Sequence, residues 1–228
     1  MPNTKPKLVW DQIGEKLWET GVDRVVLFPM TAQGGHANGV AWSGITAINE
    51  SPSGAEPTKI YADNIVYGVV MSPEEDALTV EAFTYPDEYA ECIGEASVGE
   101  GAVIKQQSHK HFGLAYRTMI GNDTVGTEHG YKIHIFWDCV AGASEDSNST
   151  INDSPEQKTF SWSVTTLPVA ATGFQPTASR VLDSTKVPEA KLTQIENLLY
   201  GTAGEGQEQG TDSTLPTFDQ IKDILDAA

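Results

Sequence analysis

The sequence has little of what catalysis, secretion or membrane insertion usually require. Its two cysteines, Cys92 and Cys139, lie far apart in the chain and form no C-x-x-C pair. Residues 1–10 contain lysines but no apolar core of the kind found in secretory signals. We therefore expect a protein made in a cytoplasm, where buried free thiols are favoured over a disulfide. The longest apolar runs, 25–29 and 133–137, are too short to span a bilayer.

The motifs of enzyme and cofactor sites are also missing. There is no G-x-S-x-G elbow, and the glycine-rich stretches 33–35 and 94–101 contain no Walker lysine. The acidic loop 144–153 lacks the spacing of an EF-hand. His109 and His111 offer two possible metal ligands, but no further His or Cys cluster accompanies them. We therefore predict no catalytic, cofactor-binding or metal-binding residue and no cofactor, and we do not expect an enzyme.

Positive charge is scarce, because 14 Lys and Arg face 32 Asp and Glu, which gives a formal net charge of −18. Such a surface repels the phosphate backbone of nucleic acids and disfavours anionic membranes. Residues 71–101 hold nine acids and no Lys or Arg. This concentration is typical of a solvated face, and it would equally suit the wall of a pore.

Alternation of apolar and polar residues with a period of two is the main structural signal. In residues 131–139 it places Tyr131, Ile133, Ile135, Trp137 and Cys139 on one face and leaves a mostly wet face with Lys132, His134, Phe136 and Asp138. Residues 160–164, 112–116 and 78–82 alternate in the same way, and 25–28, 59–70 and 178–182 are weaker candidates. The fold is therefore predicted to be mainly β, an antiparallel sandwich or barrel.

Helical signals are confined to a few short segments. Residues 86–92 predict one or two turns, and residues 188–200 predict an amphipathic flanking helix that ends at Gly201. Thr217 and Gln220 have the spacing of a capping box before a short C-terminal helix. Residues 202–214, rich in Gly, Gln, Glu and Thr, are predicted to be a flexible linker. This gives a β domain over 1–201 with an N-terminal arm, a linker over 202–214 and a helical segment over 215–228.

The five tryptophans fall into two groups. Trp137 and Trp162 lie on the apolar faces of their predicted strands, which indicates core positions. Trp10 and Trp18 are flanked by polar and charged residues, which favours a role as interface anchors.

Five longer segments resemble one known family. They are GEKLWETGVDRVVLFP (14–29), GVAWSGITAINESPSGAEP (39–57), TYPDEYAEC (84–92), FGLAYRTMIGNDT (112–124) and STINDSP (149–155), and LPTFDQI (215–221) closes the series. In this order they resemble the major tail protein, or tail tube protein, of bacteriophages with long non-contractile tails. The resemblance runs from about residue 8 to the closing segment.

The resemblance implies a β-sandwich or barrel subunit with a flanking helix. Such subunits form hexameric rings, and stacked rings form a tube in the virion tail, assembled in the bacterial host cytoplasm. DNA passes through the lumen during genome ejection without specific binding. The implied partners are other copies of the chain and the tape measure, tail terminator and distal tail proteins, with no membrane.

The resemblance also suggests which residues meet neighbours or the lumen. By position, residues 2–10 would be an N-terminal arm and residues 49–59 a long loop, both reaching neighbouring subunits. The candidate interface residues are Trp10, Trp18, Glu50, Ser51, Pro52, Glu56 and Pro57. The candidate lumen-facing acids are Glu74, Glu75 and Asp76.

Two other functions remain open from the residues. The first is a ligand-binding β-sandwich module that recognises carbohydrate or calcium on a virion or cell surface, which the acids and exposed tryptophans would also serve. The second is a jelly-roll hydrolase, for which no catalytic set can be named.

Overall fold

The computed structural model describes residues 7–151, 153, 157–204 and 209–227. Strand residues make up 45% and helical residues 13%, and the sheets are antiparallel, which confirms the predicted mainly β class. The strands are β1 (Leu17–Pro29), β2 (Val40–Ala41), β3 (Ile45–Glu50), β4 (Ser53–Gly54), β5 (Pro57–Ala62), β6 (Ile65–Met71), β7 (Glu74–Glu75), β8 (Ala77–Ala82), β9 (Ala96–Gly99), β10 (Ala102–Ile104), β11 (Phe112–Asn122), β12 (Gly126–Ala141), β13 (Phe160–Thr166) and β14 (Ser179–Asp183). The helices are α1 (Asp87–Ala90), continued by the 3-10 turn η1 (Glu91–Ile93), α2 (Glu189–Tyr200) and α3 (Phe218–Asp226).

The body of the molecule is built on one eight-stranded sheet in the order β2-β1-β11-β12-β13-β8-β3, with β14 also paired to β12. Strand β12 is long enough to pair with β14 through residues 132–136 and with β13 through residues 139–141. The sheet curls so that β3 approaches β1. No sheet in the described part of the chain is closed, so the predicted sandwich or barrel form is not confirmed.

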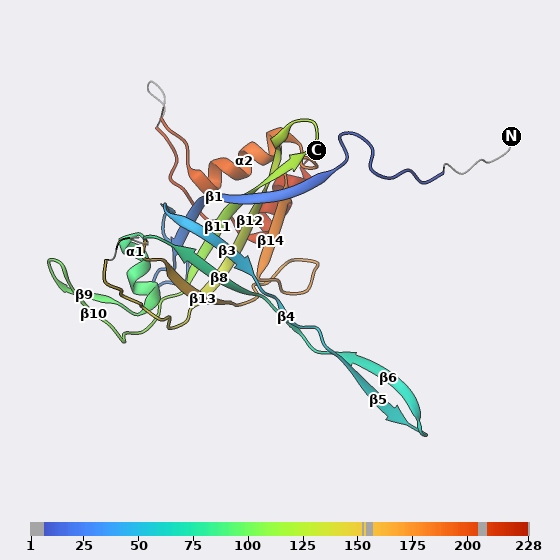
Figure 1. The fold of residues 1–228 in the computed structure, drawn as a ribbon, viewed down its shortest axis with the longest axis horizontal. Helices are drawn as coiled ribbons and strands as arrows, with labels where there is room; N and C mark the ends of the chain where they lie inside the picture. Colours follow the sequence, from blue (N-terminus) through green and yellow to red (C-terminus); the bar gives the residue numbers. More distant parts are fainter. Residues whose placement is uncertain (1–6, 152, 154–156, 205–208, 228) are drawn as a thin grey trace.

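Each face of the sheet carries its own hydrophobic core. Inside the curl, Trp42, Tyr89, Phe112 and Trp162 pack with aliphatic residues of β1, β8 and β11. On the opposite face, apolar residues of β1 and β12 pack against α2 and α3; the buried members include Phe28, Ile133, Ile135, Trp137, Leu192, Ile195, Leu199 and Ile221. Figure 1 shows α2 lying beside β1, β11 and β12. The helices therefore shield from solvent the sheet face that contains these apolar residues.

The prediction that one face of β12 is mostly wet is wrong. Phe136 and His134, which alternate with the residues of the helix-covered core, are buried within the curl. The pairing with β11 also shifts by one residue between Phe112↔Cys139 and Leu114↔Phe136, which marks a β-bulge. The bulge moves Cys139 into the core within the curl, while Trp137 stays in the helix-covered core. Strict alternation fails here because both faces are covered and an extra residue intervenes.

The helix predictions are confirmed. Gly201 ends α2 with a φ of 72°, and Thr217 and Gln220 form the expected capping box of α3. The indole nitrogen of Trp137 donates to the carbonyl oxygen of Pro216 at 2.9 Å, which fixes α3 over the sheet. In the predicted linker, residues 205–208 lie outside the described residues, and Thr202 pairs with Thr211. The division into domain, linker and C-terminal segment stays a prediction.

Both cysteines are free and buried, as the sequence favours. Burial raises the pKa of the Cys92 thiol to about 12. Since the thiolate is the reactive form, neither thiol is expected to react readily in the native protein.

Replacing Phe136 by alanine tests the burial of both faces of β12. Phe136 is 2% exposed, and removing a buried phenyl ring costs about 3–5 kcal/mol of unfolding free energy. Urea denaturation measures the loss. Phe83→Ala is the control, because Phe83 is 48% exposed and surface changes stay within about 0.5 kcal/mol. Equal losses for the two variants would contradict the two-core arrangement.

Candidate interaction surfaces

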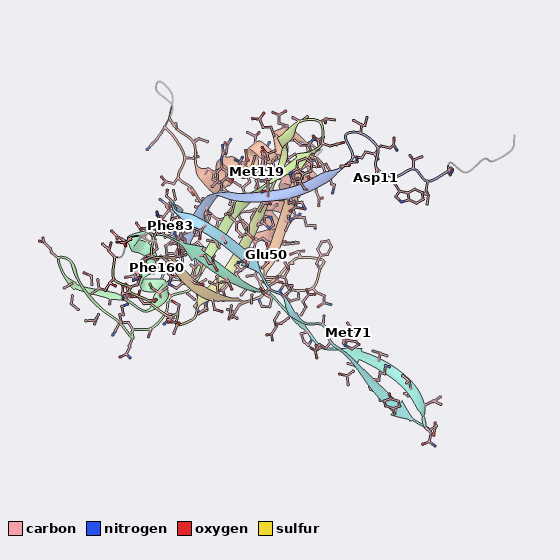
Figure 2. All side chains as sticks on the ribbon, viewed as in Figure 1. Asp11, Glu50, Met71, Phe83, Met119 and Phe160 are labelled. Carbon is pink, nitrogen blue, oxygen red and sulfur yellow. The ribbon has the colours of Figure 1, made fainter. Side chains whose placement is uncertain are left out.

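A long β-hairpin, residues 51–76, projects from the body; we call it the arm. Strands β4 and β7 pair at its base, and β5 and β6 form the ribbon beyond them. Asp63 and Asn64 close it with φ values of 51° and 63°, and two consecutive positive φ values are typical of a type I′ turn. Figures 1 and 2 show the arm extending away from the sheet, with Glu50 where it meets the body and Met71 along it.

The arm exposes apolar side chains on both faces of its ribbon. They are Ile60, Tyr61, Ile65, Val66, Tyr67, Val69, Val70 and Met71, each between 46% and 75% exposed. None belongs to either hydrophobic core. An apolar surface of this kind on a soluble chain usually marks an interaction site. The sequence identified residues 59–70 only as a weak strand, and Asp63-Asn64 is the turn signal that divides it in two.

The N-terminal segment also projects with apolar side chains exposed. Trp10 is 72% exposed and Ile13 is 86% exposed, and Figure 2 shows Asp11 on this segment, outside the sheet. The backbone nitrogen of Gly14 donates to Asp123 at 2.9 Å, at the point where the segment joins the body. The predicted N-terminal arm covers residues 2–10, and its residues 2–6 lie outside the described residues.

Trp18 lies on β1, where its indole ring packs across Gly121 of β11. A Cβ atom on Gly121 would lie 2.5 Å from the indole nitrogen, so only glycine allows this contact. The indole is 43% exposed. Trp10 and Trp18 are therefore both accessible, on separate segments.

The remaining candidate interface residues gather at the base of the arm. The backbone nitrogen of Ser51 donates to Ala77, and that of Glu56 donates to the hydroxyl of Ser72 at 3.0 Å. Pro52 is exposed between β3 and β4, and Pro57 opens β5. These residues set the position at which the arm leaves the sheet.

Glu50 is held by a polar network within its own chain. Its carboxylate accepts hydrogen bonds from the hydroxyl of Tyr116 and from Nδ1 of His134, the latter at 2.8 Å. The rings of Tyr116 and His134 stack with centroids 4.6 Å apart, and Nε2 of His134 lies 3.1 Å from the hydroxyl of Thr118. The hydrogen bond from His134 lowers the pKa of Glu50. This network ties β3 to β11 and β12 directly below the arm.

The candidate lumen acids stand at the other strand of the arm's base. Glu74 and Glu75 are exposed on β7. The carboxylate of Asp76 accepts a hydrogen bond from the hydroxyl of Ser179 at 2.9 Å, and its carbonyl oxygen accepts one from Thr166 at 2.7 Å. Asp76 thus has a structural role that the two glutamates do not share.

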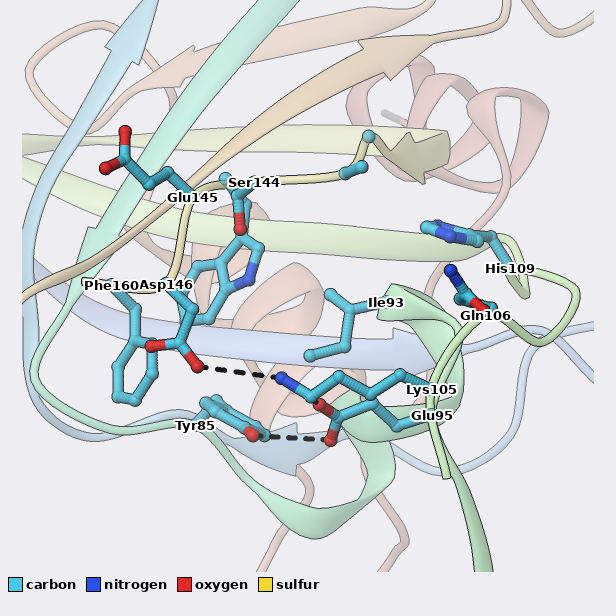
Figure 3. Close-up of a pocket in the computed structure, with 13 residues that line it drawn as sticks. Tyr85, Ile93, Glu95, Lys105, Gln106, His109, Ser144, Glu145, Asp146 and Phe160 are labelled. Atoms are coloured by element: carbon cyan, nitrogen blue, oxygen red, sulfur yellow. Dashed lines mark hydrogen bonds and ion pairs between the residues drawn. The ribbon is translucent and has the colours of Figure 1, made fainter. Parts of the chain in front are cut away.

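A pocket of about 240 Å³ lies between the β9–β10 hairpin and the loop after β12 (Figure 3). Tyr85, Phe160 and Trp162 form an aromatic group on its wall. Lys105 lies 3.4 Å from Glu95 and 3.6 Å from Asp146, joining the hairpin to the loop. Sequence patterns do not reveal this pocket because its residues come from several segments between Tyr85 and Trp162.

The two histidines considered as metal ligands bond to different groups. Nδ1 of His109 lies 2.7 Å from the carbonyl oxygen of Ala141, and Nδ1 of His111 lies 2.6 Å from the carboxylate of Asp138. Within the described ranges, no group of three or more His, Cys, Asp or Glu is placed to hold a metal ion. None of the helices described has the length and hydrophobicity to cross a bilayer.

A scan against protein-family models finds no match, and a search of curated proteins finds no match either. The segments quoted above therefore carry a resemblance to the tail tube family and no more.

The network around Glu50 predicts a specific dependence of stability on pH. The pKa of Glu50 is lowered from 4.5 in the folded state. The carboxylate therefore stabilises the fold above pH 4.5, and this contribution is lost as the pH falls through the lower folded value. Glu50→Gln should lower the free energy of unfolding by about 1 kcal/mol at pH 7. This is a small loss for a hydrogen bond to a charged group, because the side chain is partly exposed.

Urea denaturation of the monomer at several pH values checks this expectation. The difference between wild type and Glu50→Gln should shrink as the pH falls below 4.5 and through the lowered folded-state pKa of Glu50, because the wild-type carboxylate then also becomes protonated. Glu56→Gln is a matched control, since this exposed glutamate precedes β5 and bonds through its backbone nitrogen. A difference that stays constant with pH would show that Glu50 acts through packing and not through its charge.

Proposed function

We propose that the chain is a structural subunit that assembles with copies of itself into stacked hexameric rings, forming the tail tube of a bacteriophage with a long non-contractile tail. The observation that carries the proposal is the arm, whose exposed apolar side chains contribute to neither core of its own subunit. Burying such surface against another protein is favourable. The quoted sequence segments supply the choice of assembly.

Two further features support self-assembly, and a third suits the wall of a tube that conducts DNA. Strand β1 pairs with β2 through Val26 and Leu27, and no other described strand pairs with the N-terminal part of β1 on that side, which leaves a sheet edge open among the described residues. Unpaired edges favour association with another chain. The N-terminal segment adds a second projecting apolar surface. An excess of acids would keep the phosphate backbone of passing DNA from adhering to a tube wall.

Shortening the arm tests the proposal. In the variant, Asn-Gly replaces residues 55–73 and joins Gly54 to Glu74, which are already paired across the base. The shortened subunit should fold with an unchanged thermal midpoint, because the removed residues lie in neither core. It should fail to form rings or tubes by electron microscopy and sedimentation. A wild type that stays monomeric, or a shortened variant that still forms tubes, would refute the proposal.

A lumen position for part of the acid-rich region 71–101 is a second, separable expectation. Glu74→Lys with Glu75→Lys should leave tubes intact but slow genome ejection, because cationic side chains in the wall attract passing phosphates. Asp76 is left unchanged because it bonds to Ser179. Ejection is followed by DNA release from purified particles, with Glu189→Lys on α2 as the control. Normal ejection kinetics in the double variant would place these acids away from the DNA path.

A further inference from the structure

A pocket with aromatic and charged walls lies on the side of the molecule formed by β14, α3 and the loop after β13. It has a volume of about 390 Å³, and its walls include Phe174, Gln175, Arg180, Phe218, Lys222 and one acid, Asp226. Phe174 is 69% exposed and meets Phe218 edge to face, with centroids 5.9 Å apart. In a chain with a net charge of −18, this pocket is unusual because its two cations outnumber its one acid and lie beside two phenyl rings.

Arg180 is the centre of this pocket. Its guanidinium lies 4.9 Å from the centroid of Phe218, and its one hydrogen bond among the described residues reaches the carbonyl oxygen of Phe218 at 3.5 Å. Burial lowers the pKa of Arg180, and the nearby charge of Asp226 only partly opposes this effect.

No described carboxylate lies within ion-pair distance of Arg180 or Lys222, whereas Arg117 binds Asp23 through two hydrogen bonds. A partly buried guanidinium gains from a carboxylate that approaches it in a fork geometry. The pocket therefore fits a ligand that combines a carboxylate with apolar or aromatic groups.

The tip of the arm has this combination. Asp63 is exposed at the turn, with Tyr61, Ile65 and Tyr67 beside it at 66%, 63% and 75% exposure. Asp63 forms no ion pair with a described residue of its own chain. Glu74 and Glu75, by contrast, lie at the base of the arm, paired with Ser53 and Gly54.

We propose that the pocket around Arg180 and Lys222 receives the Asp63 turn of a second copy of this chain. Nine residues, 55–63, lead from the base of the arm to its tip, and at about 3.3 Å per residue the tip lies roughly 30 Å beyond the base. Figure 1 shows the arm pointing away from its own body. The contact joins two different surfaces, so it repeats from copy to copy, either closing into a ring or continuing from one ring to the next. This inference rests on the proposed function, because it names the surface that receives the arm of a neighbouring subunit.

Charge reversal tests this pairing in the full-length protein. Asp63→Lys alone and Lys222→Glu alone should each raise the concentration needed for assembly by roughly tenfold or more, because like charges then meet in the contact. The double variant Asp63→Lys with Lys222→Glu should recover assembly to within roughly threefold of wild type. Sedimentation gives the assembled fraction, and circular dichroism verifies that each variant folds. Glu100→Lys, at the tip of the β9–β10 hairpin, is the matched control and should assemble normally.

A cross-link gives an independent measurement that leaves the charged groups in place. The pair Asn64→Cys and Gln175→Cys should form a disulfide between subunits under mild oxidation, and the buried native cysteines should not interfere. Tubes that assemble normally in both single-charge variants, without cross-linking, would overturn the pairing and leave the proposed function standing. A wild type that stays monomeric would overturn both.

Discussion

The structure depends on the burial of strand β12 on both faces. Side chains of alternating residues enter two different cores, one inside the curled sheet and one beneath α2 and α3. The same strand pairs with β11 along one edge and with β14 and β13 along successive parts of the other. Every larger element is therefore fixed relative to this strand. The arm and the N-terminal segment can project because the body does not need their apolar residues.

The polar network below the arm links this framework to the projecting hairpin. Glu50 is the last residue of β3, and His134 belongs to β12. Their hydrogen bond joins the start of the arm to the central strand, with Tyr116 of β11 completing the contact. An exposed ribbon can occupy a defined direction only if its base is fixed, and this network fixes one of its two strands. Asp76, bonded to Ser179 of β14, fixes the other.

Much of the fold follows from local patterns in the sequence. The alternation of Phe160, Trp162 and Val164 indicates β13, and Thr217 with Gln220 indicates the start of α3, because these signals involve neighbouring residues. The burial of the other face of β12 could not be predicted in the same way, since nothing within residues 131–139 shows that the curled sheet covers the face containing His134 and Phe136. The bulge before Cys139 depends on the partner strand β11.

The candidate site was less accessible to sequence reasoning. Glu50 lies 66 residues from Tyr116 and 84 residues from His134, so no spacing rule connects them. The arm was divided between a predicted loop and a weak strand, because apolar residues on both faces of a ribbon give no alternation. Arg180 and Phe174 become neighbours of Phe218 only through the packing of α3 against β14. Such contacts are set by tertiary structure, and local patterns do not encode them.

The two-stranded construction of the arm has a consequence for how firmly any single contact can hold. A hairpin of two strands without a core is only marginally stable in water. Part of the free energy released on docking is then spent on reducing the conformational entropy of the ribbon, so an individual arm contact is weak and reversible. In the proposed assembly, a misplaced subunit would dissociate, while a correctly placed one would be retained by two arm contacts, one through its own arm and one through its pocket. The low stability of the isolated arm would thus favour accurate assembly over rapid assembly.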